Sequence, residues 1–237
     1  MKNRFFSMIF YTIVVIIVGA CVAKSQKPTS ERGLDRITVE DNYQPPLSTT
    51  ASSPTSPLDI AIQYRHRRKN TDDFKRLNEG DTLYSGDQYQ IVFTPTETTY
   101  VYIFQKGSSG NFYQLFPMRS FNGVTVNNFN PAQSDTTYFI PAQDKSFYLD
   151  EQVGEEKIYF IAARQPNKQF ENQYQQVLIA RRGRNATNVQ TAQSHLESAI
   201  QMRDPGGIIT HSPNNPSLWQ RLEICEGCVN TLTFHHQ

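Results

Sequence analysis

The chain has almost no net charge and very little cysteine. Its 23 basic and 22 acidic residues give a formal charge of +1. General nucleic-acid binding depends on an excess of positive charge, so we expect no nucleic-acid partner. The sequence also contains no His-Glu-x-x-His zinc motif, no glycine-rich phosphate loop and no Gly-x-Ser-x-Gly nucleophile motif. We therefore expect no cofactor and no enzymatic activity, although a hydrolase with a scattered site stays open.

Long apolar runs are missing except near the N-terminus. There Lys2 and Arg4 precede an apolar stretch over residues 8–18, and Gly19 and Ala20 follow it. This order is typical of a secretory signal over residues 1–20. Cys21 comes next and resembles the lipobox cysteine of bacterial lipoproteins, which implies cleavage before Cys21 and lipid attached to it. The alternative is an uncleaved anchor, but the stretch is short for a bilayer, which takes about 20 apolar residues.

The lipobox resemblance predicts a protein held at a membrane of the cell envelope through lipid on Cys21. In two-membrane bacteria the residue after the lipidated cysteine guides sorting, and Val22 favours the outer membrane over retention in the inner one. Cleavage removes Lys2 and Arg4 and no acidic residue, so the mature chain keeps 21 of the 23 basic and all 22 acidic residues. It therefore stays close to neutral.

Composition divides the mature chain in two. Residues 21–58 are rich in Pro, Ser and Thr and have few large apolar groups, so they cannot bury enough surface to offset their ordering entropy. We expect a disordered tether there. Residues 59–237 hold most of the aromatic residues, which make up 12% of the chain. They predict a single β-rich domain.

Short strands with turns between them dominate this domain. Residues 88–93 alternate as in a strand with one buried face. Residues 100–104 are apolar on both faces and predict a strand covered on both sides, joined to residues 112–116 in a hairpin. Further strands are expected over residues 136–140, 146–149, 157–163 and 176–180. This pattern predicts a mainly β fold, an antiparallel β-sandwich or barrel-like domain.

One amphipathic C-terminal helix is expected over residues 188–202. Val189, Ala192, Leu196, Ala199 and Ile200 form one apolar stripe, residue 188 can cap the start, and the Pro and Gly residues at 205–207 end it. We expect this helix to pack on the sheets. Residues 208–228 are expected to be irregular, before a last strand over residues 229–234.

The middle of the chain resembles a bacterial family, the domain of unknown function 4384, over residues 77–164. The motifs that carry the resemblance are Gly86-Asp87, Tyr100-Val101-Tyr102-Ile103-Phe104, Ser109-Gly110, Tyr113-Gln114-Leu115-Phe116-Pro117, Ile140-Pro141, Phe147-Tyr148-Leu149-Asp150 and Gly154-Glu155-Glu156-Lys157-Ile158-Tyr159. The resemblance implies an extracytoplasmic or accessory β domain and supplies no catalytic residues.

Cys225 and Cys228 remain as a pair near the C-terminus. The envelope outside the cytoplasm is oxidising, so we interpret them as a structural disulfide. The alternative is a zinc site that adds His235 or His236. Adjacent histidines in an extended segment point to opposite faces, so at most one of them turns towards the metal.

Charged clusters supply the remaining candidates. Arg181, Arg182 and Arg184 lie between an expected strand and the helix, and residues 65–69 form a second basic run. Both are solvated turns or contacts for an anionic partner. The neighbouring carboxylates at 72–73 and 155–156 are interpreted as solvated charges.

These observations favour an envelope lipoprotein whose β domain binds another protein as an accessory or structural component of an assembly. Arg181, Arg182 and Arg184 are the candidate binding residues. The alternative is a module that binds cell-wall or polysaccharide chains, and a cleft lined by exposed tyrosine beside these arginines would favour it.

Overall fold

The computed structural model describes residues 56–210 and 217–237, and these belong to one compact unit. The predicted signal at 1–20, Cys21 and nearly all of the predicted tether lie outside the described residues. No helix in the described ranges is long and apolar enough to cross a membrane.

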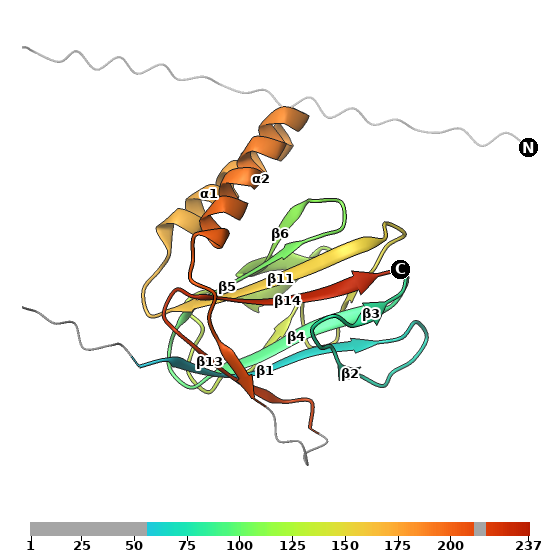
Figure 1. Cartoon of the computed structure of the whole chain (residues 1–237), viewed down its shortest axis with the longest axis vertical. Coiled ribbons are helices and arrows are strands. Elements are labelled where there is room, and N and C mark those ends of the chain that lie inside the picture. Colours follow the sequence, from blue (N-terminus) through green and yellow to red (C-terminus); the bar gives the residue numbers. More distant parts are fainter. Residues whose placement is uncertain (1–55, 211–216) are drawn as a thin grey trace, which may run out of the picture. The chain divides into compact units, whose positions relative to one another are not determined.

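Two largely antiparallel sheets face each other (Figure 1). The first has β10 (Phe147–Tyr148), β4 (Gln88–Pro95), β1 (Leu58–Arg67), β13 (Gln220–Ile224) and β12 (Ile208–Thr210) in that order, with β2 (Lys75–Arg76) on β1 and β9 (Tyr138–Ile140) on β4. The second has β3 (Thr82–Leu83), β14 (Val229–His236), β11 (Gly154–Ala163), β5 (Tyr100–Lys106) and β6 (Phe112–Phe116). A separate hairpin joins β7 (Met118–Phe121) and β8 (Val124–Asn128).

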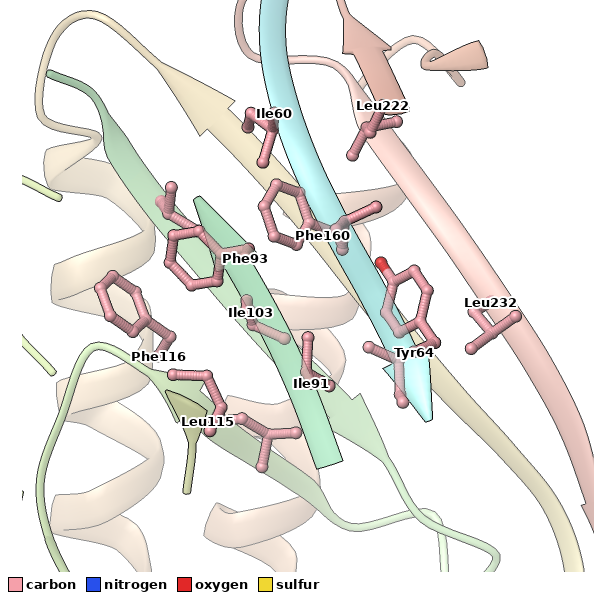
Figure 2. Close-up of a cluster of buried hydrophobic side chains, with 14 of the residues drawn as sticks. Ile60, Tyr64, Ile91, Phe93, Ile103, Leu115, Phe116, Phe160, Leu222 and Leu232 are labelled. Atoms are coloured by element: carbon pink, nitrogen blue, oxygen red, sulfur yellow. The ribbon is translucent and has the colours of Figure 1, made fainter. Parts of the chain in front are cut away.

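The main core fills the space between the two sheets (Figure 2). Phe93 lies at its centre, with its ring 5.2 Å from Phe116 and 5.6 Å from Phe160, both edge-on, and 5.2 Å from Tyr138 in a stack. Burying a side chain such as Phe or Ile contributes roughly 1.5–3 kcal/mol, so this aromatic centre is a large part of what holds the sheets together. The predicted sandwich class is confirmed.

A second core lies on the other face of β5 and β11, under two helices. These are α1 (Lys168–Arg182) and α2 (Ala186–Gln201), which pack side by side (Figure 1). Tyr102 and Phe104 face the helices, whereas Val101 and Ile103 face the other sheet. The prediction that strand 100–104 is covered on both faces is therefore confirmed.

The prediction of a strand over residues 176–180 is wrong, because this segment belongs to α1. The run of Val, Leu and Ile there suggested a strand, but Phe170, Tyr174 and Val177 follow helical spacing and face the second core. Asn167 starts the helix by accepting a hydrogen bond from the Phe170 amide at 3.1 Å. The domain thus has a helical hairpin, not one helix.

Residues 208–228 were expected to be irregular, but they contain β12 and β13, which extend the first sheet beyond β1.

Strand β4 also differs from its prediction. Its expected solvent-facing residues Gln88 and Gln90 are buried. Gln90 donates to the carbonyls of Ala142 and Lys145 at 2.6 and 2.7 Å, and both glutamines accept hydrogen bonds from arginines of β1.

Candidate functional site

A cleft of about 340 Å³ opens where the two sheets end side by side. β6 is the last strand of the second sheet and β10 is the last strand of the first. The turn over residues 107–111 forms one wall, and the segment over residues 147–152 forms another. The β7–β8 hairpin also lines the cleft, through Phe121 and Asn122.

The floor of the cleft is a chain of polar side chains. Tyr89 donates its hydroxyl to Gln105 Oε1 at 2.7 Å, and Gln105 Nε2 donates to Glu156 Oε2 at 2.8 Å. The backbone amide of Ser108 donates to Glu156 Oε1 at 2.9 Å. Burial raises the pKa of Tyr89 well above its usual value of 10.0, and the nearby charge of Glu156 raises it further. The Tyr89 hydroxyl therefore keeps its proton at neutral pH and donates it in the hydrogen bond to Gln105.

The interpretation of residues 155–156 as solvated carboxylates is wrong for Glu156, which is only 4% exposed. Glu155 lies on the opposite face of β11 and pairs with Lys157 at 2.8 Å. Neighbouring residues of a strand lie on opposite faces, but the sequence does not show that the turn at 107–111 covers one of these faces.

Aromatic rings form the upper part of the cleft. Tyr148 is 67% exposed and Tyr113 is 44% exposed, and both line the opening. Phe147 lies between Tyr89 and Phe121, with ring centroids 5.1 and 5.3 Å away. The cleft thus combines a charged, hydrogen-bonded floor with aromatic walls.

The turn over residues 107–111 requires special backbone geometry. Gly110 has a φ of +76°, in the left-handed region that glycine adopts without strain. Ser108 Oγ donates to the Gln152 carbonyl at 2.6 Å, and a Cβ at Gly154 would lie 2.9 Å from Ser108 Cβ. Glycine at 154 therefore allows this turn to pack against the start of β11 and to shape the cleft.

Of the predicted binding residues, Arg181 and Arg182 end helix α1 and Arg184 lies in the turn that leads to α2, so they do not lie between a strand and a helix. Arg181 is engaged within the protein: it donates to the Phe112 carbonyl at 2.6 Å and to Gln193 Oε1 at 2.9 Å. Arg182 and Arg184 are exposed and make no ion pair within the described ranges.

A second cleft, of about 560 Å³, lies on the other side of the turn at 107–111. Arg181 and Arg184 line it together with Gln190 and Gln193 of α2. The Arg181 guanidinium also lies 4.9 Å from the centre of the Tyr113 ring, and Tyr113 lines the first cleft. Tyr113, an exposed tyrosine of the first cleft, is thus adjacent to Arg181.

The basic run at 65–69 is largely tied into the fold. Arg68 pairs with Asp87 at 2.7 Å, and Asp87 also accepts from the backbone amides of Lys69 and Tyr84, both at 3.0 Å. Burial would raise the pKa of Asp87, but these donors outweigh it and hold the pKa below 3.8. The Gly86-Asp87 motif therefore has a structural role: it fixes the turn before β4.

Cys225 and Cys228 are joined by a disulfide across the turn between β13 and β14, with Cα atoms 5.3 Å apart. This turn carries the chain from the first sheet to the second. His235 and His236 stand at the far end of β14, about 23 Å along an extended strand. The alternative of a zinc site that combines these histidines with the cysteines is therefore wrong.

Sequence reasoning missed the cleft because its residues come from separate segments. One local signal was available: Asn122-Gly123 is a common turn pair between strands, and both residues have positive φ, 47° and 78°. It would have predicted the β7–β8 hairpin, whose turn lines the cleft. Glu156 carries no comparable local signal.

Comparison with known proteins connects this cleft to a family. Residues 82–166 match the model described as "Domain of unknown function (DUF4384)". Every residue that lines the first cleft lies inside this match, whereas α1 and α2 lie outside it. No curated protein and no solved structure matches the chain. Residues 82–166 are therefore similar to the DUF4384 family.

Proposed function

We propose that this protein is an envelope lipoprotein, anchored in the outer membrane through lipid on Cys21, whose β domain binds another protein as an accessory component of an assembly. The observation that carries the binding role is the first cleft. It is built wholly from the segment that matches the family, and two tyrosines stand exposed at its opening.

The chemistry of the cleft suits recognition of a protein. Tyrosine is enriched among the residues that dominate protein interfaces, because it buries a large rigid ring and keeps a hydroxyl for hydrogen bonding. Tyr148 and Tyr113 offer such rings, and Glu156 and Gln105 offer oriented polar groups below them. A projecting side chain of a partner would find both apolar contact and a polar end point.

The aromatic face of β5 that points away from the other sheet is not available to a partner. Tyr102 and Phe104 on the outer face of β5 pack against Phe170 of α1, at ring distances of 5.8 and 5.7 Å. The outer edge of β6 is also covered at Phe112, whose amide donates to Gln193 Oε1 at 3.0 Å and whose carbonyl accepts from Arg181. We therefore propose that recognition takes place at the cleft and not on this face.

Binding of a cell-wall or other polysaccharide chain is the second candidate. The contact between Arg181 and Tyr113 supports this candidate, since the contact brings an exposed tyrosine next to the cluster of Arg181, Arg182 and Arg184. Sugar rings stack on such aromatic groups, and arginine side chains bind their acidic substituents.

Site-specific photo-crosslinking in intact envelopes separates these candidates. A photoreactive residue at Tyr148 is expected to give a discrete protease-sensitive adduct, and one at Ile208 of β12, equally exposed at 67%, is expected to give none. Polydisperse adducts that glycan-degrading enzymes shorten would favour the second candidate. Equal adducts at both positions, or none at Tyr148, would contradict a binding role for the cleft.

The anchor has its own test. Replacing Cys21 by Ser should prevent lipid attachment and release the protein from membranes. A Cys21→Ser protein that stays membrane-bound and keeps residues 1–20 would show an uncleaved anchor.

A further inference from the structure

The first cleft contains a buried carboxylate that has no cation beside it. Glu156 is 4% exposed, and its two oxygens accept one hydrogen bond each, from Ser108 N and Gln105 Nε2. Within residues 56–210 and 217–237, no Lys, Arg or His lies within ion-pair distance of it. An ionised carboxylate can accept about four hydrogen bonds, so Glu156 keeps acceptor capacity towards the cleft.

The nearest lysines in the sheet cannot supply the missing charge. Lys106 and Lys157 are neighbours in the β5–β11 ladder, on the face opposite to Gln105 and Glu156. On that face Lys106 pairs with Glu197 of α2 at 2.5 Å, and Lys157 pairs with Glu155. A carboxylate removed from water without a counter-charge is costly, so Glu156 is better satisfied when a cation enters the cleft.

The walls suit a cation as well. The rings of Tyr148, Phe121 and Phe147 line the same cleft as Glu156, and so does the exposed Asp150. An ammonium or guanidinium group over an aromatic face is attracted by the ring, most strongly where water is excluded. At about 340 Å³ the cleft is at the small end of ligand pockets, which suits one side chain.

We propose that the cleft recognises the charged end of a lysine or arginine side chain that projects from the partner protein. This inference rests on the proposed function and adds the chemistry of the partner: a basic residue whose aliphatic stem packs on Tyr148 and whose cation reaches Glu156. The Tyr89–Gln105 hydrogen bond orients the amide that holds Glu156 in place.

The test uses short peptides as probes and the full chain in detergent. The peptides are acetyl-Gly-Lys-Gly-amide, its arginine analogue and its norleucine analogue, which keeps the stem and lacks the charge. Binding is followed through the backbone amide signal of Ser108 by NMR. We expect saturable shifts with lysine or arginine and about tenfold weaker binding with norleucine, since a tenfold change corresponds to about 1.4 kcal/mol. Equal binding of all three peptides would overturn the proposal.

Two variants locate the site. Glu156→Gln should weaken the lysine peptide about tenfold, whereas Glu151→Gln, an exposed neighbour outside the cleft, should leave it unchanged. Tyr148→Ala provides a second reading that does not disturb Glu156, because the Tyr148 ring is largely exposed, and Phe129→Ala is its matched control. Unchanged binding by both Glu156→Gln and Tyr148→Ala would contradict the proposal.

The outcomes also separate this inference from the proposed function. A protein adduct at Tyr148 together with no response to the lysine peptide would support protein binding by the cleft and overturn the proposal that a basic side chain is what it binds. A response of Ser108 to N-acetylglucosamine oligomers, with none to the lysine peptide, would overturn both in favour of a polysaccharide.

Discussion

The guanidinium of Arg181 stacks over the ring of Tyr113, 4.9 Å from its centre, and its Nη2 donates to the carbonyl of Phe112. One side chain at the end of α1 thus holds the helical hairpin to the edge strand β6. Because Tyr113 also lines the first cleft, Arg181 is a structural link between the hairpin and the cleft wall.

Arg181→Ala should therefore destabilise the fold. It removes two charge-assisted hydrogen bonds from a partly buried group, which we expect to lower the free energy of unfolding by about 1–3 kcal/mol. Arg182→Ala serves as the control and should change it by less than about 0.5 kcal/mol, because this side chain is exposed. Urea unfolding measures both. Equal stability of the two variants would show that the link contributes nothing.

The exposed arginines should act on binding instead. Replacing Arg182 and Arg184 by Ala is expected to weaken attachment to an envelope partner while leaving the urea midpoint unchanged. The weakening should shrink as salt rises, since exposed charges are screened within about 10 Å at 0.1 M. Partner recovery equal to wild type at low salt would make this turn a solvated surface only.

The disulfide turn leads to a stability prediction at Gly206. A Cβ there would lie 2.6 Å from Cys225 Sγ and from Cys228 Cβ, and the cross-linked atoms cannot move aside. Gly206→Ala should therefore lower the free energy of unfolding by about 1–3 kcal/mol. The double replacement of Cys225 and Cys228 by Ser should cost at most about 2 kcal/mol, because the closed loop is very short. If Gly206→Ala melts like wild type, the close packing of this turn is not as described.

Stability should depend on pH through His66. Burial lowers the pKa of His66 below 6.5, and the nearby Arg68 lowers it further, against the opposing charges of Asp81 and Asp87. Below pH 6.5 the unfolded chain protonates this histidine more readily than the folded chain does. The contribution of His66 to the free energy of unfolding is therefore complete above pH 6.5 and declines as the pH falls towards the pKa of the folded state. Asp87, whose pKa is held below 3.8, stabilises the fold above that pH, and this stabilisation is lost only in stronger acid.

Urea midpoints at pH 7.5 and pH 5 test this assignment. The wild-type protein should lose stability between them, and His66→Gln should lose less. His235→Gln, at an exposed position of β14, should behave like wild type. A His66→Gln protein with the same pH dependence as wild type would assign the effect to another group.

The sequence predicts the sandwich well where one strand carries enough information by itself. Residues 100–104 are apolar on both faces, and both faces are buried. Prediction fails where burial comes from distant segments: Gln90 in β4 is buried by carbonyls of residues 142–145, and Glu156 by the turn at 107–111. Helix α1 was missed because the Val-Leu-Ile run at 177–179 suggested a strand, although the residues that face the second core follow helical spacing. The cleft could not be predicted, since its walls meet only in the folded sheets.

The measurement that most directly tests the central claim is the effect of Glu156→Gln on the photo-crosslink at Tyr148 in intact envelopes. If the cleft holds a basic side chain of a partner protein, Glu156→Gln should reduce the protein adduct severalfold at unchanged protein level, while Glu151→Gln should leave it at the wild-type yield. An adduct of equal yield in all three proteins would contradict the account.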